Sequence, residues 1–188
     1  MKRPITTLTA LLLAAAPLAA VSLTSTSTSA AAATPTHVVE HMRLITGKMD
    51  HKPGWPKITN ASWTVQKGQT VTVQIVSFDD GTAPLMGKYM PYANVKGTLN
   101  GKELVNGKPV ANVSDINIAH TFTVPGLGFN MPIPVAPTGG HIVVTASFVA
   151  KKTGTFVWHC YAPCGSGTNG MTGAMSTMSW MTGEVHVK

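Results

Sequence analysis

The sequence predicts an all-β sandwich in one domain. Short runs of alternating apolar and polar residues recur from Val38 to Lys188, and turn residues separate them. The clearest run, residues 70–78, alternates with a period of two. No amphipathic helix and no internal repeat interrupts this pattern. Short strands at such spacing in a chain of 188 residues are typical of a two-sheet sandwich.

Each strand is predicted from its own alternation and the turns beside it. Residues 49–59, which contain Pro53-Gly54, are predicted as a loop. Asn100-Gly101 and Asn106-Gly107 are hairpin-turn dipeptides, and the first is expected to join strands 95–99 and 102–105. Residues 79–117 are interpreted as an insertion between core strands. The other predicted strands are 40–46, 62–65, 70–78, 118–124, 141–150, the run ending at Cys160, and 183–187.

The first residues have the pattern of a secretory signal. A basic start, Met1-Lys2-Arg3, precedes an apolar run over 8–21 and a series of small residues ending at Ala33. We therefore expect a signal peptide over 1–33, cleaved near Ala32 or Ala33, and a β-domain over 34–188. The location would be secreted or periplasmic. The apolar run is shorter than the ~20 residues of a membrane span, so membrane attachment is expected only if the signal stays uncleaved.

Charge and composition argue against several functions. The formal charge is +7, but it is carried mainly by single lysines, and no basic stripe interleaved with aromatics indicates nucleic-acid binding. A weakly positive face can still steer an acidic redox partner. Of the seven acidic residues only Asp79 and Asp80 are adjacent, beside a turn glycine. No catalytic triad order or phosphate-binding loop is present, so neither an enzyme nor a small-molecule substrate is predicted.

Both cysteines lie in one stretch that suggests a metal site. Cys160 ends a predicted strand, and Cys164 follows in a loop that starts near Pro163 and is rich in Gly, Ser and Met. Two soft thiol ligands four residues apart in a Met-rich chain suggest copper. Because export places both thiols in an oxidising compartment, a Cys160–Cys164 disulfide is the alternative.

The phase of the strand before Cys160 predicts which side chains point inward. Alternation places Phe156, Trp158 and Cys160 on one face and Val157 and His159 on the other. Phe156 and Trp158 are the expected core pair, so Cys160 should point inward at the end of the sandwich. His159 should point away, and it is not expected to bind the same metal.

His120 completes a pattern that resembles a known family. It lies in the strand Ile118 to Val124, within Ala-His-Thr-Phe-Thr-Val-Pro-Gly, and is followed forty residues later by the Cys-x3-Cys loop. Together these segments resemble the periplasmic cupredoxin domain of cytochrome c oxidase subunit II, which carries the dinuclear CuA centre. The resemblance covers about residues 111–173. It implies a cupredoxin-like Greek-key sandwich and a copper site with one or two ions.

The same resemblance implies the ligands. His120 matches the first imidazole, Cys160 and Cys164 match the bridging thiolates, Met171 matches the methionine, and Ala162 would give the backbone carbonyl. Met175 and Met181 are further candidate ligands in the same loop, although a methionine stripe is more often core filling.

One position departs from the family pattern. Thr168 stands where the family has its second His, so the imidazole of the second copper is missing. One imidazole, one or two thiolates and thioethers form a soft set that favours Cu(I). A histidine from elsewhere is the other way to complete a site, and the candidates are His37, His41, His51, His141 and His186.

The sequence therefore predicts an exported cupredoxin-like copper protein. Its expected role is outer-sphere electron transfer to a partner protein that docks at the loop end. One alternative is a Cu(I) carrier or scavenger without redox turnover. The other is a metal-free binding module closed by a disulfide.

Overall fold

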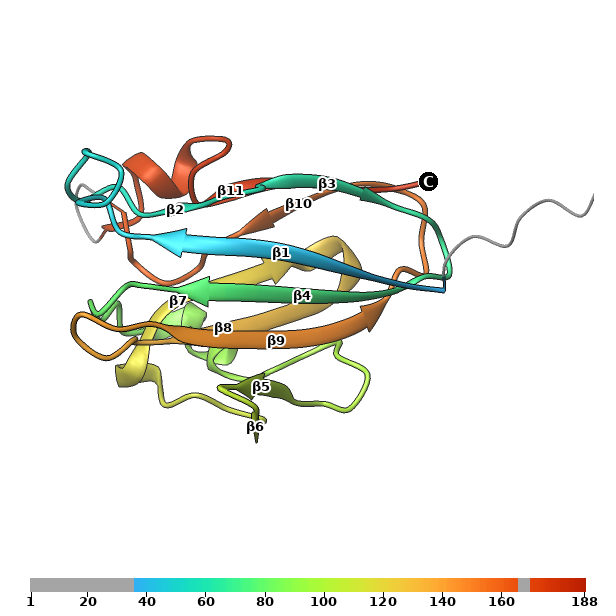
Figure 1. The fold of residues 1–188 in the computed structure, drawn as a ribbon, viewed down its shortest axis with the longest axis horizontal. Coiled ribbons are helices and arrows are strands. Elements are labelled where there is room, and N and C mark those ends of the chain that lie inside the picture. Colours follow the sequence, from blue (N-terminus) through green and yellow to red (C-terminus); the bar gives the residue numbers. More distant parts are fainter. Residues whose placement is uncertain (1–35, 166–169) are drawn as a thin grey trace, which may run out of the picture. The chain divides into compact units, whose positions relative to one another are not determined.

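Two β-sheets packed face to face make up the fold (Figure 1). The computed structural model describes residues 36–165 and 170–188, and the structural statements below concern these residues. One sheet has the strand order β2-β1-β4-β9-β5-β6, and the other has β3-β11-β10-β7-β8. The bounds are β1 His37–Ile45, β2 Lys57–Ile58, β3 Ser62–Val65, β4 Thr70–Ser77, β5 Glu103–Val105, β6 Lys108–Val110, β7 Ile118–Val124, β8 Phe129–Pro134, β9 Ile142–Val149, β10 Gly154–His159 and β11 Thr182–Val187.

The pairing of the strands is mostly antiparallel. β1 runs parallel to β4, and β3 runs parallel to β11, while the other strand pairs are antiparallel. The predicted all-β sandwich is confirmed, and most predicted strands coincide with observed ones within a few residues.

The core lies between the sheets and follows from the alternation in the sequence. Val71, Val73 and Ile75 of β4 are fully buried, while the residues between them are partly exposed. The second sheet contributes large aromatic side chains, and Phe129 of β8 reaches Phe148 of β9 with ring centroids 4.8 Å apart. Burial of such side chains stabilises the fold by about 1.5–3 kcal/mol each.

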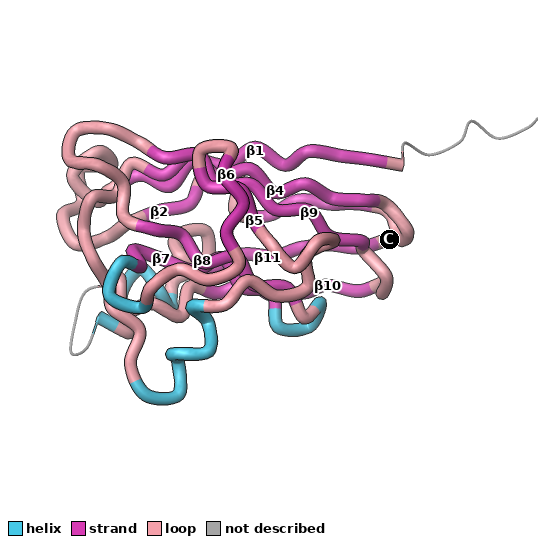
Figure 2. Tube along the Cα trace, turned by 90° about the horizontal axis from the view of Figure 1, so that it is seen from below, coloured by secondary structure: helices cyan, strands magenta, loops and turns pink. Residues whose placement is uncertain are grey.

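Strand β7 is buried along its whole length, which is unusual for a strand in a two-layer sandwich. The segment around η1, a 3-10 helix over Gly87–Ala93, lies against the neighbouring strand β8; Figure 2 draws the 3-10 helices in cyan. Asn130 of β8 holds this segment, because its amide donates hydrogen bonds to the carbonyls of Tyr92 (2.9 Å) and Asn94 (2.7 Å).

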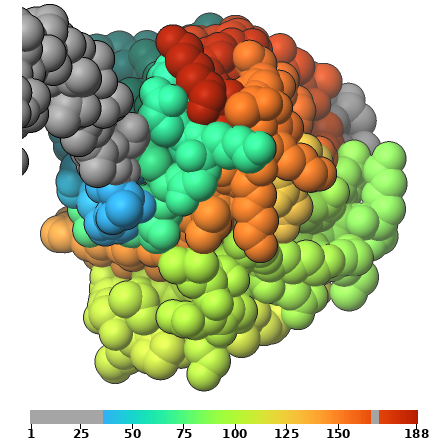
Figure 3. Space-filling view, turned by 90° about the vertical axis from the view of Figure 1, so that its right-hand side faces the viewer, coloured from blue at the N-terminus to red at the C-terminus, as the bar shows by residue number. Residues whose placement is uncertain are grey.

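The segment between β4 and β7 differs from prediction in its hairpin. Residues 95–99 form no strand, and the hairpin instead joins β5 to β6 around Asn106-Gly107, where both residues have positive φ (48° and 78°). Asn106 also accepts a hydrogen bond from the Val143 N–H at 2.8 Å, which anchors the turn to β9. Figure 3 looks onto the end of the sandwich where the C-terminus lies, and the yellow-green segment containing β5 and β6 lines one side.

Two short strands were not predicted. β8 contains Pro132 and Pro134, which weaken a strand pattern, but it is the last strand of its sheet, where proline is tolerated. β2 lies within the predicted loop 49–59. The predicted signal peptide falls outside the described residues and stays a prediction. In the described part, no helix is long and apolar enough to cross a membrane.

Candidate metal centre

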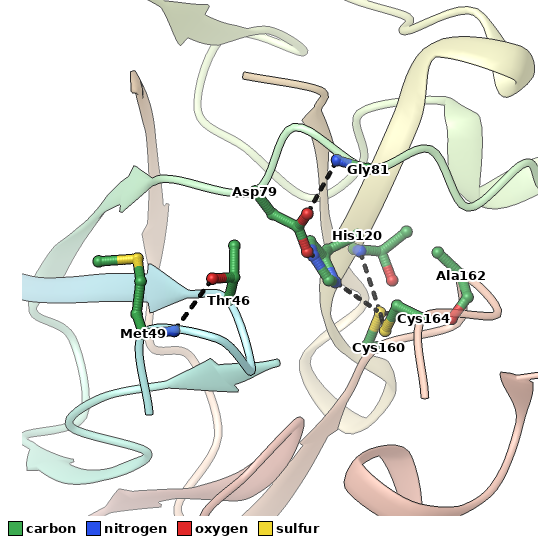
Figure 4. A network of polar contacts seen from close by, with 9 residues as sticks. Thr46, Met49, Asp79, Gly81, His120, Cys160, Ala162 and Cys164 are labelled. Atoms are coloured by element: carbon green, nitrogen blue, oxygen red, sulfur yellow. Dashed lines mark hydrogen bonds and ion pairs between the residues drawn. The ribbon is translucent and has the colours of Figure 1, made fainter. Parts of the chain in front are cut away.

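Three ligand atoms from distant parts of the sequence meet at one end of the sandwich. His120 of β7, Cys160 at the end of β10 and Cys164 in the following loop each offer a donor atom, and these atoms lie within 4.8 Å of one another (Figure 4). Both thiols and the imidazole thus come together as the sequence predicted.

The backbone around the thiols explains this convergence. β10 and β7 are neighbours, and their pairing continues into the loop because the Tyr161 N–H donates to the Thr121 hydroxyl at 2.8 Å. The Thr121 N–H in turn donates to Cys160 Sγ at 3.4 Å. On the other side, the Cys160 N–H donates to the Met181 carbonyl at 3.2 Å. Cys160 is therefore held on two sides, through its sulfur by β7 and through its backbone by Met181, which directly precedes β11.

Cys160 points into the core, as its strand phase predicts. It is 2% exposed and shares the inner face with Trp158, while Val157 and His159 lie on the outer face. Its Sγ lies 3.9 Å from His120 Nδ1 and 3.6 Å from the Ala162 carbonyl oxygen. That carbonyl is the group which the family resemblance implied as a ligand.

The two cysteines are free thiols. Their sulfurs lie 3.1 Å apart, well beyond the ~2.05 Å of a disulfide bond. Burial opposes ionisation of Cys160, but the Cys164 thiol, the His120 ring and the Thr121 N–H hold the pKa of the Cys160 thiol well below its usual value. Burial and the neighbouring Cys160 raise the pKa of Cys164. The Cys160 thiol therefore ionises more readily than the Cys164 thiol that faces it.

Asp79 is a part of the site that sequence reasoning missed. The residue follows β4, and its carboxylate lies 2.8 Å from His120 Nε2, while its other oxygen accepts the Gly81 N–H at 2.9 Å. With Nε2 bound to a carboxylate, the Nδ1 atom is the one that faces the sulfurs. A carboxylate behind a ligating imidazole fixes its tautomer and orientation.

The charges of this group follow from the same contacts. Burial lowers the pKa of His120, but Asp79 and Cys160 outweigh it and raise the pKa to about 9. Burial would raise the pKa of Asp79, and its bonds to His120 and Gly81 lower it instead. Without a metal, an imidazolium thus lies between a carboxylate and a thiolate. A metal at Nδ1 would replace that proton, so uptake is expected to release protons.

The predicted methionines occupy different surroundings. Met171 is partly buried and lines a cavity of about 380 Å³ with Met86, Tyr89 and Pro163. Met175 (7% exposed) and Met181 (0%) are buried members of the core. Met175 nevertheless packs close to the thiol loop, since a Cβ on Gly165 would lie 3.2 Å from its Cγ.

A second imidazole is not part of this group. Among the described residues, none of the other histidines joins the three donors. His37 and His41 instead contact Thr72 (2.8 Å) and Gln74 (2.9 Å) on the first sheet, and His186 contacts Thr155 at 3.0 Å. Thr168 lies outside the described residues.

All three tyrosines of the chain stack beside the thiol loop. Tyr161, next to Cys160, stacks on Tyr92 with centroids 4.2 Å apart, and Tyr89 lies 5.9 Å from Tyr161. His159 lies 5.8 Å from Tyr161 on the outer face. The stack links the segment around η1 to the site, a contact between distant residues that the sequence alone did not predict.

A cleft of about 550 Å³ opens on the other side of the loop. Cys164 lies in its wall, together with Asp79 and Asp80, and the opposite wall comes from residues 46–56. His120 and Cys160 do not line this cleft. Of the three donors, Cys164 is therefore the one that this cleft reaches.

Comparison with known proteins gives distant likenesses of fold. No family model and no curated protein matches the chain. Among solved structures, rusticyanin from Thiobacillus ferrooxidans is 14% identical, with a TM-score of 0.39 over 82% of this chain and 79% of that one. A multicopper oxidase from Pediococcus acidilactici is 12% identical, with a TM-score of 0.39 over 85% of this chain and 28% of that one. Both TM-scores are under 0.5, so these likenesses carry no conclusion about function, which rests on the site itself.

Proposed function

We propose that this chain is a cupredoxin-like copper protein that transfers electrons outside the cytoplasmic membrane. One observation supports it above all: a buried imidazole, oriented by a carboxylate, directs Nδ1 at two unbonded sulfurs within 4.8 Å. Thiolates and thioethers suit Cu(I), zinc and iron–sulfur clusters, and imidazole suits zinc, copper, iron and nickel, so copper is among the metals that these donors bind. The donor set therefore fits the metal that the sequence implied.

The residues that would hold copper are His120, Cys160 and Cys164, with Met171 as the thioether and Ala162 as the carbonyl. The bound metal would supply a one-electron couple. The chain's own residues would fix the ligand geometry and exclude water, because His120 and Cys160 are 1% and 2% exposed. A partner protein would dock at the loop end. The proposal includes the similarity of this centre to that of cytochrome c oxidase subunit II, and a content of one or two copper ions.

A second candidate function is Cu(I) carriage. It is favoured by the single imidazole among the described ligands and by the partly exposed Cys164 in the cleft wall. A carrier would bind Cu(I) tightly and would not be reoxidised by a redox partner, whereas an electron carrier cycles between both oxidation states.

The test is to load the reduced, purified chain with copper and record stoichiometry and visible absorption in both oxidation states. Electron transfer predicts intense thiolate charge-transfer bands that bleach on reduction and return on oxidation. His120→Ala should abolish them, while His186→Ala, which alters a surface imidazole, should leave them unchanged. A colourless one-to-one Cu(I) complex would favour carriage. A chain that binds no copper would refute both functions.

A further inference from the structure

The 46–56 loop places a methionine in the wall of the cleft that Cys164 also lines. Met49 is 45% exposed and lines the same 550 Å³ cleft as Cys164. Figure 4 shows Met49 on the far side of Thr46 and Asp79 from the His120 and cysteine group. No role in the proposed centre has been given to this residue.

The position of Met49 is fixed by its turn. Its N–H donates to the Thr46 carbonyl at 3.0 Å and lies 3.3 Å from the Thr46 hydroxyl. The loop itself is held in place, because Trp55 packs edge-on against Trp180 at 5.1 Å and Lys52 Nζ lies 3.1 Å from the Trp55 ring centre. The backbone of Met49 is thus held in the wall of the cleft.

We propose that this cleft is the route by which the chain takes up Cu(I), with the Met49 thioether as the first ligand and the Cys164 sulfur as the second. The inference rests on the proposed function. His120 and Cys160 are almost fully buried and do not line the cleft, so Cys164 is the one of the three donors that an ion in the cleft would meet first.

The chemistry of the walls suits this role. A thioether binds Cu(I) without having to lose a proton, and it is a weak ligand that releases the ion readily. Cys164 would then take the ion as its thiol gives a proton to solvent, and copper stays Cu(I) throughout. Asp79 and Asp80 add negative charge to the cleft, and Lys48 adds one positive charge.

The test follows Cu(I) transfer from its coloured bicinchoninate complex to the reduced, full chain by stopped-flow absorbance. Met49→Leu keeps the size and apolar character of the side chain and removes the sulfur. We expect it to slow transfer by roughly five-fold, with final stoichiometry and affinity unchanged. The matched control is Met90→Leu, which removes an equally exposed sulfur (51%) outside the cleft and should transfer at the wild-type rate.

Equal transfer rates for Met49→Leu and Met90→Leu would overturn the route while leaving the copper centre intact. A wild-type chain that takes up no Cu(I) at equilibrium would refute the proposed function and the route with it.

Discussion

Two carboxylic acids inside this protein have opposite surroundings. Asp79 lies at the end of β4 and meets the His120 ring at 2.8 Å and the Gly81 N–H at 2.9 Å. Glu103, at the start of β5, is 1% exposed, and both its oxygens lack a hydrogen-bond partner among the described residues. Burial acts to raise the pKa of both carboxyl groups, so the difference between them shows the effect of a hydrogen-bond partner.

A hydrogen-bond partner decides whether a buried carboxyl group is protonated or ionised in the folded protein. Burial alone raises the pKa of Glu103 to about 9, so the side chain is neutral in the folded protein at pH 7. In Asp79 the same effect of burial is outweighed by His120, which lowers the pKa and keeps a carboxylate. Asp79 thus keeps its negative charge inside this sandwich because the His120 imidazole bonds to it. His120 is also one of the residues proposed to bind the metal.

The largest expected effect is on the pH dependence of stability. Glu103 has a raised pKa in the folded state, so its contribution is complete below its unfolded pKa of 4.5 and is lost as pH rises toward 9. Glu103→Gln cannot ionise and removes this loss. Relative to wild type, the variant should gain about 4 kcal/mol in unfolding free energy between pH 5 and pH 8, measured by urea denaturation.

The control for this prediction is Glu184→Gln, which changes a carboxylate that is 36% exposed on β11. Its difference from wild type should stay nearly constant over the same pH range. Parallel stability curves for wild type and Glu103→Gln would show that the buried carboxyl has a partner or water that lowers its pKa.

The next effect concerns the paired acid and the proposed metal. Asp79→Asn keeps the shape of the side chain but removes the charge behind His120. Copper affinity should fall by about ten-fold, because outer carboxylates orient a ligating imidazole and raise its basicity. Competition with a Cu(I) chelator measures this change.

Asp80→Asn is the matched control, since it removes the same charge from the neighbouring residue, which also lines the cleft. Its affinity should stay within about two-fold of wild type. Equal losses for Asp79→Asn and Asp80→Asn would mean that only the overall charge of the cleft matters. The orienting role of Asp79 would then be wrong.

Much of the fold was predictable because the alternation of apolar and polar residues along a strand follows the alternation of buried and exposed side chains. Thr70–Ser77 and Ile142–Val149 alternate in sequence and pair in register with alternate residues buried. The hairpin at Asn100-Gly101 was wrong because two turn dipeptides lie close together, and only Asn106-Gly107 joins two strands, of which β5 also pairs with β9. Phe129–Pro134 was missed because its prolines hide an edge strand.

The sequence predicted the three candidate donors that lie together, but not the carboxylate that orients the imidazole. Spacing and strand phase placed Cys160 inward, and family resemblance pointed to His120 and Cys164. Asp79 could not be found this way, because a turn acid beside a glycine is common and its partner is 41 residues away. Glu103 gave no signal either, since a lone glutamate between turn residues is usually solvated.

The smallest expected effect comes from an acid that is neither buried nor isolated. Glu184 lies 3.4 Å from His186, and both side chains are 36% exposed. Water solvates both groups in the folded and unfolded chains, so Glu184→Gln should change the unfolding free energy by under about 0.5 kcal/mol, and less at high salt. Urea denaturation at low and high sodium chloride tests this. A salt-independent loss of several times that size would mean that a partner alone, without burial, makes an acid important to this fold, and the contrast between Asp79 and Glu103 would then need another explanation.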